Sequence, residues 1–584
     1  MPGVRELPMI RLYRISIFTL SFSLLILSGS AQNLADIGKS NPIAVTGGVS
    51  LNQIFYTAGG IENRRDPYTY YASGNVNFSL YGWNVPLSFA VSNRNTSFQQ
   101  PFNQYSVHPT YKWITGHAGY CSMSYSPYTV NGHIFLGGAV DLAPEGNWKF
   151  SALYGRFLRA VQPETDTAGL ITNTPSFKRM GYGFKTSYSK DGTTVDLIVF
   201  HAKDEIGSIA YVPDSLGILP QENLVVSVGA GKTFFDHIVL KGELSSSALS
   251  RDIRAQEGEH VHPLANVGFL YTPHLSSSYY KAFKTSLNYQ QDTYSFGVGY
   301  ERIDPQYRTL GAYYFNSDLE SITANGAASL WQGKMNVAVG AGTQRDNLDK
   351  SKVSTMRRMV GSLNVNYVPN QKLNVSASYS NFQTYTNIRS QFVNINQLTP
   401  YDNLDTLNYT QISQSITATT TYVLSNTKER RQSLNLNVNV QDAADKQGQV
   451  TQNSGSKFYN VNAGYMYNVV PQNLTVSVAF NANINDNPAV TTRTLGPTAT
   501  VSKLFFDRKL RASVSSSYNN TYTNSERVST ILNGRINGSY TIQKKHNLNL
   551  SMVAVNRKST SETSAKSFTE FTGTLGYSYV FGLK

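Results

Sequence analysis

The chain has 584 residues, a formal charge of +14 and only 15% Asp, Glu, Lys and Arg, whereas a typical soluble domain has about 25% charged residues. After the first 30 residues no apolar run approaches the roughly 18 residues of a membrane-spanning helix, which excludes a helical membrane protein. Lys and Arg are scattered over turns and loops without a basic helix or stacking platform, so no nucleic-acid partner is expected. The basic balance favours contact with anionic lipid headgroups, or a lumen that prefers anions.

The N-terminus is typical of a secretory signal peptide. Three Arg precede an apolar stretch over residues 15–27, and small residues follow up to Ala31. Cleavage after Ala31 would remove three Arg and one Glu and leave a formal charge of +12. An uncleaved anchor helix is the alternative, for which the apolar stretch is short. We therefore expect a signal peptide over residues 1–31 and a short periplasmic leader over residues 32–42.

Cys121 is the only cysteine, so the chain can form no internal disulfide and has no lipid-attachment cysteine after the signal. An exported protein of this size needs another source of stability. A closed, hydrogen-bonded barrel supplies it, because closure leaves no unpaired sheet edge.

Alternation of apolar and small polar residues recurs along nearly the whole chain, in segments of about ten residues, the length that a tilted strand needs to cross a bilayer. Leu434–Val440 reads Leu-Asn-Leu-Asn-Val-Asn-Val, and similar segments surround Val76, Leu373, Ile416 and Leu474. A soluble β-sandwich also alternates, but its outer face usually carries Lys and Glu. Here the polar half is mainly Asn, Ser and Thr, which favours a membrane barrel. A surplus of Tyr and Phe over Trp would supply aromatic girdles at its interfaces.

Short turn signals alternate with longer polar stretches, as expected for an outer-membrane barrel with short periplasmic turns and long outer loops. The short turns are expected at Gly82 and at residues 144–147, 191–192, 235–237, 332–333, 369–372, 471–473, 507–509 and 544–546. The long loops are expected at residues 94–104, 162–176, 204–221, 251–262, 344–355, 384–405, 442–456, 519–526 and 557–566.

The mature chain shows no composition shift, so residues 43–584 are expected to form one all-β domain, a transmembrane antiparallel β-barrel. About 11 or 12 short turns predict roughly 24–26 strands. Residues 271–315 and 111–127 resist a clean strand assignment. The roughly ten residues before the first strand leave no room for a separate plug domain.

The last strand places aromatic and apolar residues at every second position, from Phe571 to Phe581. Its end resembles the C-terminal insertion signal of Gram-negative outer-membrane barrels, with Thr574 and Gly576 followed by the aromatics Tyr579 and Phe581. The resemblance implies recognition by the barrel-assembly machinery, which could approach closely at the glycine. Three residues follow the last aromatic, more than is usual. An ordinary terminal strand of a soluble sheet is the alternative.

Residues 300–315 and 342–349 are similar to stretches in large, uncharacterised outer-membrane proteins of the Bacteroidota, and this resemblance implies no established activity. The second segment is rich in Asp and Asn and could hold calcium through oxygen ligands. It lacks the spacing of a calcium loop, so a solvated outer loop is the expected alternative.

Candidate catalytic and metal residues are sparse. His260 and His262 lie on one side of an extended segment and could bind a metal, but they fall in an expected loop with no third ligand, which favours plain surface polarity. The remaining His are dispersed, and neither a Gly-rich phosphate loop nor a Cys-x-x-Cys pair is present. We therefore expect neither a cofactor, a resident metal nor an enzyme, although a site assembled from distant loops would escape sequence inspection.

The sequence thus predicts an outer-membrane conduit or docking pore for a bulky solute, polysaccharide or protein. Because a wide bore would leak, loops or a partner should close the lumen. Expected fillers are residues 384–405, 204–221 and the aromatic-rich 98–115. The alternative is a structural or surface-attachment barrel whose loops bind a surface polymer or secreted partner. Expected partners are outer-membrane lipid, lipopolysaccharide, the barrel-assembly machinery and a secreted or surface protein.

Overall fold

The fold is known from a computed structural model. It describes residues 43–93, 103–166, 171–210, 217–259, 262–266, 270–313, 315–351, 357–381, 412–443, 446–447, 450–451, 456–487, 489–560 and 566–582. The expected signal peptide and leader, and the expected loop at residues 384–405, lie outside the described residues.

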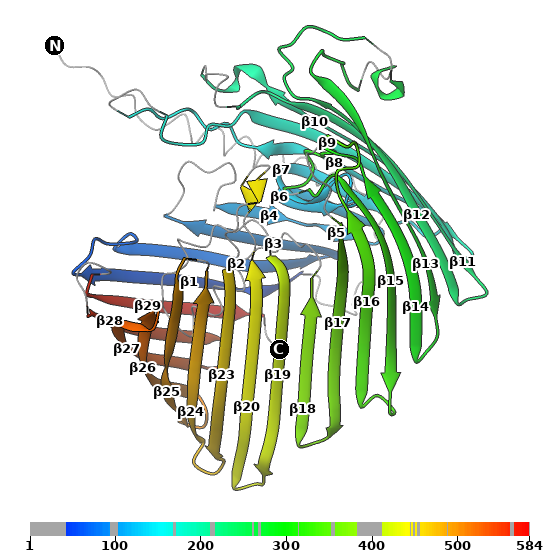
Figure 1. The fold of residues 1–584 in the computed structure, drawn as a ribbon. Coiled ribbons are helices and arrows are strands. Elements are labelled where there is room, and N and C mark those ends of the chain that lie inside the picture. Colours follow the sequence, from blue (N-terminus) through cyan, green and yellow to red (C-terminus); the bar gives the residue numbers. More distant parts are fainter. Residues whose placement is uncertain are drawn as a thin grey trace, which may run out of the picture.

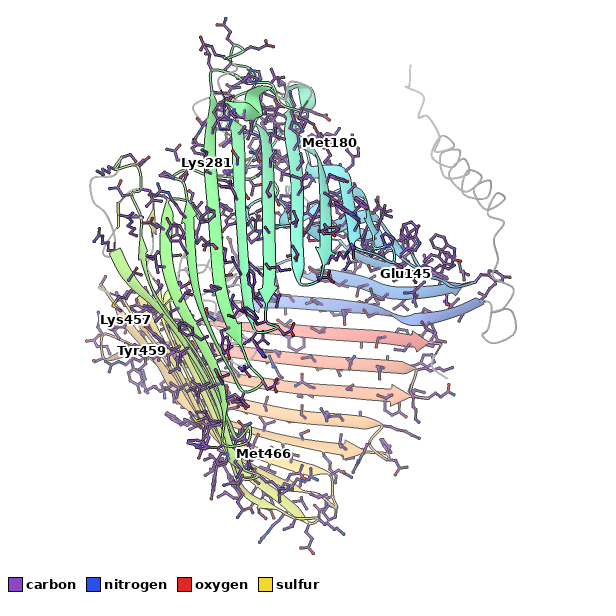
Figure 2. The ribbon with its side chains drawn as sticks, turned by 90° about the vertical axis from the view of Figure 1, so that its right-hand side faces the viewer. Glu145, Met180, Lys281, Lys457, Tyr459 and Met466 are labelled. Atoms are coloured by element: carbon purple, nitrogen blue, oxygen red, sulfur yellow. The ribbon has the colours of Figure 1, made fainter. Side chains whose placement is uncertain are left out.

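The described chain forms one closed antiparallel β-barrel of 26 strands. Strand β1 (Ile43–Gly59) pairs with the last strand, β29 (Phe568–Phe581), with Ser50 opposite Ser578. Figure 1 and Figure 2 show these blue and red strands side by side, where the sheet meets itself. The short strands β4 (Gln104–Val107) and β5 (Thr110–Tyr111) together occupy one position in the wall between β3 and β6.

The other wall strands follow in chain order, each paired with the next. They are β2 (Tyr68–Leu80), β3 (Trp83–Ser92), β6 (Ile114–Ser124), β7 (Asn131–Leu142), β8 (Trp148–Leu158), β9 (Lys178–Lys190), β10 (Thr193–Glu205), β11 (Glu222–Phe234), β12 (Ile238–Ser250), β13 (Ser277–Gln290), β14 (Tyr294–Ile303), β15 (Leu319–Leu330), β16 (Met335–Arg345), β17 (Arg357–Asn370), β18 (Leu373–Ser380), β19 (Ile412–Asn426), β20 (Arg430–Ala443), β23 (Ser456–Val469), β24 (Leu474–Asp486), β25 (Thr491–Phe505), β26 (Leu510–Thr523), β27 (Glu526–Ile542) and β28 (His546–Ser559). Outside the wall lie a small hairpin, β21 (Lys446–Gln447) with β22 (Val450–Thr451), and the 3-10 helices η3 (Ile206–Ser208) and η5 (Pro263–Asn266).

The predicted strand number and the nine predicted short turns are confirmed, and the described residues form no separate plug domain. These turns bend the chain within a few residues, often through left-handed backbone such as Asp191 (φ 48°) and Asn473 (φ 49°). Three further short turns, at residues 112–113, 291–293 and 427–429, contain neither Gly nor Pro. Both described ends of the barrel chain lie at the short-turn end, since Ile43 is opposite Leu80 and Phe581 is opposite Gly47.

Alternation along each strand separates an apolar outer face from a polar lumen face. On β20, Leu434 and Leu436 face outward and are exposed, whereas Asn435 faces inward, where Thr421 Oγ1 donates a hydrogen bond to its Oδ1 atom (3.0 Å). Because the outward apolar side chains cover no protein, this face requires an apolar surrounding. The alternation in the sequence therefore maps directly onto the two sides of the wall.

Aromatic side chains gather on the outer face at the short-turn end. All four Trp of the chain lie there, next to short turns, and are between 41% and 62% exposed: Trp83, Trp113, Trp148 and Trp331. Trp83 stacks on Tyr111 with ring centroids 4.9 Å apart, and Trp331 contacts Tyr367 edge-on at 5.8 Å. A row of this kind is typical of a membrane interface, where one end of an amphipathic ring is wet.

One predicted loop is wrong. Residues 519–526 are mostly strand, because β26 continues to Thr523 and β27 begins at Glu526 after a two-residue turn with positive φ at Asn524 and Ser525. Where a strand extends beyond the apolar layer of the membrane, its outward residues can be polar. A polar stretch at that height can therefore be strand, and its polarity does not identify a loop.

Candidate functional site

The lumen is the candidate site, and one sector of it is filled by a hairpin that turns inward. Strand β7 pairs with β6 along its whole length from Asn131, but it pairs with β8 only from Leu136 to its end. The first residues of β7 therefore have a partner in β6 but none in β8. The end of this hairpin, residues 121–135, is called the inward tip. Its Val130 and Phe135 are fully buried in a cluster with Phe200, which faces the lumen from β10. The tip is therefore held by apolar packing against the inner wall.

A second segment, residues 304–313 between β14 and β15, lies on the inward tip and is called the inward loop. Tyr307 donates a hydrogen bond from its hydroxyl to the backbone oxygen of Tyr128 (2.9 Å), and Thr309 donates one to that of Thr129 (2.6 Å). The amide of Asn131 donates to the oxygen of Gly311 (3.0 Å). Two loops far apart in sequence thus form one packed body inside the barrel, and the inward tip and inward loop together are called the inward body.

Wall residues hold this body in place through hydrogen bonds as well as packing. The Leu310 amide donates to Asn223 Oδ1 on β11 (3.1 Å), and Ser247 on β12 donates to the Arg308 oxygen (2.8 Å). Such bonds satisfy backbone groups that an irregular buried segment would otherwise leave unpaired.

Two carboxylates on the wall accept hydroxyl hydrogens from the inward tip. Tyr128 donates to Glu301 on β14, and Ser126 donates to Glu243 on β12. Ser227 on β11 also donates to Glu243 (2.7 Å). Hydrogen bonds to a charged acceptor are stronger than neutral ones, so these contacts fix the depth of the tip in the lumen.

Burial keeps the two tyrosines of this body in the neutral, donating form. Tyr128 and Tyr307 are almost fully buried. Burial raises the pKa of Tyr128 far above its ordinary value, with Glu301 adding to the effect, and burial together with the charge of Glu243 does the same for the pKa of Tyr307. Both hydroxyls therefore remain donors at every physiological pH.

The predicted fillers do not supply this body. The described part of residues 98–115 forms β4, β5 and the start of β6, so this prediction was wrong: these residues are wall. The described part of residues 204–221 is held at the ends of the neighbouring strands. Ser208 Oγ there accepts a hydrogen bond from the backbone amide of Lys178 (2.9 Å). At the same rim Arg179 forms a two-pronged ion pair with Asp204 (2.7 and 2.8 Å). Residues 384–405 lie outside the described part.

The rest of the lumen wall has a different chemistry from the filled sector. Between β8 and β14 charged residues face inward, including Lys185 and Asp196, 3.7 Å apart, and the Lys284–Glu301 pair. From β15 to β25, away from strand ends, no charged residue of the described strands faces the lumen. Inward positions there are held mainly by Asn, Ser and Thr, among them Asn364, Asn366, Ser376, Ser378, Thr417, Thr419, Asn435, Asn437, Asn462, Asn481 and Thr498.

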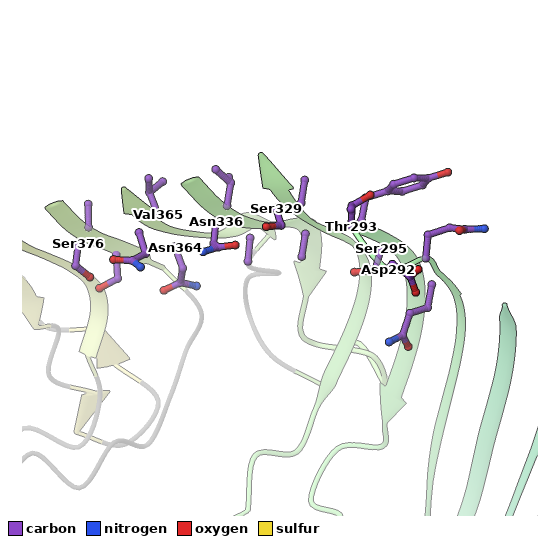
Figure 3. A pocket seen from close by; sticks show the side chains of 18 residues that line it. Asp292, Thr293, Ser295, Ser329, Asn336, Asn364, Val365 and Ser376 are labelled. Atoms are coloured by element: carbon purple, nitrogen blue, oxygen red, sulfur yellow. The ribbon is translucent and has the colours of Figure 1, made fainter. Parts of the chain in front are cut away.

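A shallow groove of about 440 Å³ runs from the β13–β14 turn, where Asp292 is its one charged lining residue, across the neutral wall as far as β18 (Figure 3). Its lumen-side lining includes Ser329, Asn336, Asn364 and Ser376. Figure 3 shows that Asn364 points to one side of the sheet and its neighbour Val365 to the other. The groove therefore offers amides and hydroxyls to whatever occupies the lumen.

Sequence reasoning missed a hydrogen-bonded chain of side chains on the lumen wall near β4 and β6. Ser106 Oγ lies 3.1 Å from His108 Nε2, the two Nδ1 atoms of His108 and His117 are 2.8 Å apart, and His117 Nε2 lies 3.0 Å from Asp141. A serine, imidazole and carboxylate in line is the order of a hydrolytic triad. The Ser106 hydroxyl, however, also bonds Ser88 (2.8 Å), and its strand is engaged on both sides by β3 and β6. These hydrogen bonds therefore hold the short strands β4 and β5 in the wall and do not present a nucleophile. Their residues are brought together only by the fold, so the sequence did not show them.

The four residues of the predicted insertion signal lie at the seam of the barrel. Thr574 and Gly576 face the lumen, and Tyr579 and Phe581 face outward with ring centroids 5.8 Å apart. A Cβ atom on Gly576 would lie 2.6 Å from Asn52 Oδ1, so a larger residue here would displace the Asn52 side chain. Recognition by an assembly machine stays a prediction.

Two segments were considered as metal sites in the sequence, although no resident metal was expected, and the described residues bring no third ligand to either. His260 lies outside them, and His262 stacks on Tyr279 with centroids 4.2 Å apart. Next to the predicted calcium segment, the Asp318 carboxylate accepts the backbone amides of Asn347 and Leu348 (2.9 and 2.8 Å), so it organises the loop. Over the described ranges, no group of three or more His, Cys, Asp or Glu could hold a metal ion.

Among the described residues, no helix has the length and apolar character needed to cross a membrane.

No protein-family model and no curated protein sequence matches the chain. Solved structures with a similar fold include the FrpB iron transporter from Neisseria meningitidis, at 10% identity over 92% of this chain and 82% of that one, with a TM-score of 0.36. The ferric citrate transporter FecA is 8% identical over 92% and 78% of the two chains (TM-score 0.37). The P pilus usher (PapC) translocation pore is 9% identical over 93% and 100% (TM-score 0.36). Similarity at this distance transfers no activity, substrate or partner to this chain.

Proposed function

We propose that the protein is an outer-membrane conduit for a bulky polar solute, narrowed by the inward tip and the inward loop. The observation that carries the proposal is the two-faced wall: an apolar outer surface with an aromatic row at one end, and a polar lumen. Barrels of 16–18 strands already leave an aqueous channel, and this wall has 26. A barrel of this width is larger than an anchor requires.

Passage would be passive or gated by a partner. The inward body occupies the sector between β6 and β14 and leaves the neutral wall from β15 to β25 to line the path. Polar groups on this wall can replace water around a polar solute as it moves. The bulky solutes that fit are polysaccharides, other large polar molecules or polypeptides.

Single-channel recording in planar bilayers tests the conduit. Purified protein is expected to give discrete current steps, either as isolated or after the inward body is released. If neither form conducts, the proposal fails, and the surface-attachment function, in which the outer loops bind a polymer or secreted partner, takes its place.

A further inference from the structure

The wall formed by β17 and β18 carries amides and hydroxyls that bond to no other side chain among the residues that the structure describes. Asn364 and Asn366 on β17, and Asn374, Ser376 and Ser378 on β18, face the lumen and are exposed. Within the described part of the chain, no hydrogen bond joins these five side chains to the rest of the protein. We call them the amide wall.

Further round the barrel the same residue types are already engaged with each other. Asn462 Nδ2 donates to Asn481 Oδ1 (2.6 Å), and Asn481 Nδ2 donates to Thr498 Oγ1 (2.8 Å). Asn439 Nδ2 donates to Thr417 Oγ1 (3.0 Å). The amide wall differs from this region in pairing, not in composition, so its donors and acceptors are left to solvent or a solute.

The arrangement of these groups is a regular lattice. Ser378 lies opposite Asn364 and Ser376 opposite Asn366, and these four residues line the groove of about 440 Å³. Adjacent strands are about 4.8 Å apart, and side chains on one face repeat about every 6.8 Å along a strand. A solute lying on this surface meets a donor or acceptor at each of these steps.

We infer that the amide wall binds an uncharged, hydroxyl-rich glycan chain; this rests on the proposed conduit function and names the class of its solute. Each sugar hydroxyl is both donor and acceptor, as is each Asn amide and Ser hydroxyl of the wall. The wall offers no positive charge to an anionic solute, which would lose hydration without compensation. A polypeptide backbone is best recognised by adding a strand to a free sheet edge, and the closed barrel has no such edge.

Saturation-transfer NMR on the full-length protein in detergent tests this binding directly, whether or not the barrel conducts. The probes are the neutral maltoheptaose, cellopentaose and mannopentaose, with oligogalacturonate as the anionic counterpart. At least one neutral probe is expected to bind in the millimolar range and the anionic one not to bind. The N364A/N366A double variant is expected to bind about tenfold more weakly, because two solvent-facing amides are lost.

The matched control is Asn462→Ala, which removes an amide that is already bonded to Asn481 and should leave binding unchanged. Binding of no neutral probe, equal binding of oligogalacturonate, or equal losses in the double variant and the control would each overturn the glycan assignment. Current steps without glycan binding would support the conduit function and overturn only the glycan assignment. Glycan binding without current steps would overturn the conduit function and support the glycan site.

Discussion

Replacing Tyr128 and Tyr307 by Ala should release the inward body and raise the single-channel conductance at least about twofold, because a barrel of this strand number encloses a wide lumen. Both side chains are almost fully buried, and they contact each other with ring centroids 6.4 Å apart. Truncating a large buried aromatic residue costs about 3–5 kcal/mol. The Tyr307 variant also leaves the Tyr128 backbone oxygen without its donor. Planar-bilayer recording measures the change.

The control for this release is Tyr154→Ala, which removes an equal side chain from the outer face of β8, where it is 62% exposed. Its conductance should match that of the unmodified protein. If the double variant folds and its conductance is unchanged, the inward body does not narrow the path.

A lysine on the outer face should destabilise the barrel far more than one on the lumen face. Leu436 and Asn437 are neighbours near the middle of β20, with Leu436 facing outward and Asn437 facing the lumen. Leu436→Lys is expected to cost about 2–4 kcal/mol in the free energy of unfolding, the usual cost of a basic residue at the bilayer midplane. Urea titration of the protein refolded into lipid vesicles measures this cost.

Asn437→Lys is the matched control, since it adds the same charge one residue away. It should change the free energy of unfolding by less than about 1 kcal/mol, because a wet lumen solvates the ammonium group. Equal costs for the two variants would mean that both faces of β20 have the same surroundings, which contradicts a membrane wall.

The wall could be predicted from the sequence because its physics is local. Each strand needs one face for an apolar surrounding and one for water, so Leu434–Val440 alternates, and the tight turn at Asp191-Gly192 is marked by residues that tolerate left-handed backbone. The turn at residues 112–113, which contains neither Gly nor Pro, was not predicted because no turn-forming residue marks it.

The inward body could not be predicted for a related reason. It comes from residues 121–135 and 304–313, which overlap residues 111–127 and 271–315, the two stretches that resisted a clean strand assignment in the sequence. Side chains there pack on the inner wall and on each other, so neither face meets lipid or water consistently. The Tyr128–Tyr307 contact joins residues 179 positions apart, and length and polarity pointed instead to other loops as fillers.

The sequence showed which residue types line the lumen, but not where in the barrel the candidate site lies. Asn374, Ser376 and Ser378 already alternate with apolar residues in the sequence. Only the register shows that Asn366 lies opposite Ser376 and that, away from strand ends, no charged residue of the described strands from β15 to β25 faces the lumen. Side-chain pairing, which separates the amide wall from the region around Asn462, depends on the relative positions of several strands.

Disulfide trapping across the seam tests most directly whether a single sheet closes on itself. Ser50→Cys with Ser578→Cys, in a Cys121→Ala background, joins residues that face each other on β1 and β29. The pair should oxidise nearly completely in membranes and change the migration of the unfolded protein on a non-reducing gel. Ser50→Cys with Thr574→Cys, four residues out of register, should not link, because its Cα atoms would lie beyond the roughly 7 Å limit of a disulfide. Failure of the first pair, or equal linking of both, would contradict the closed barrel.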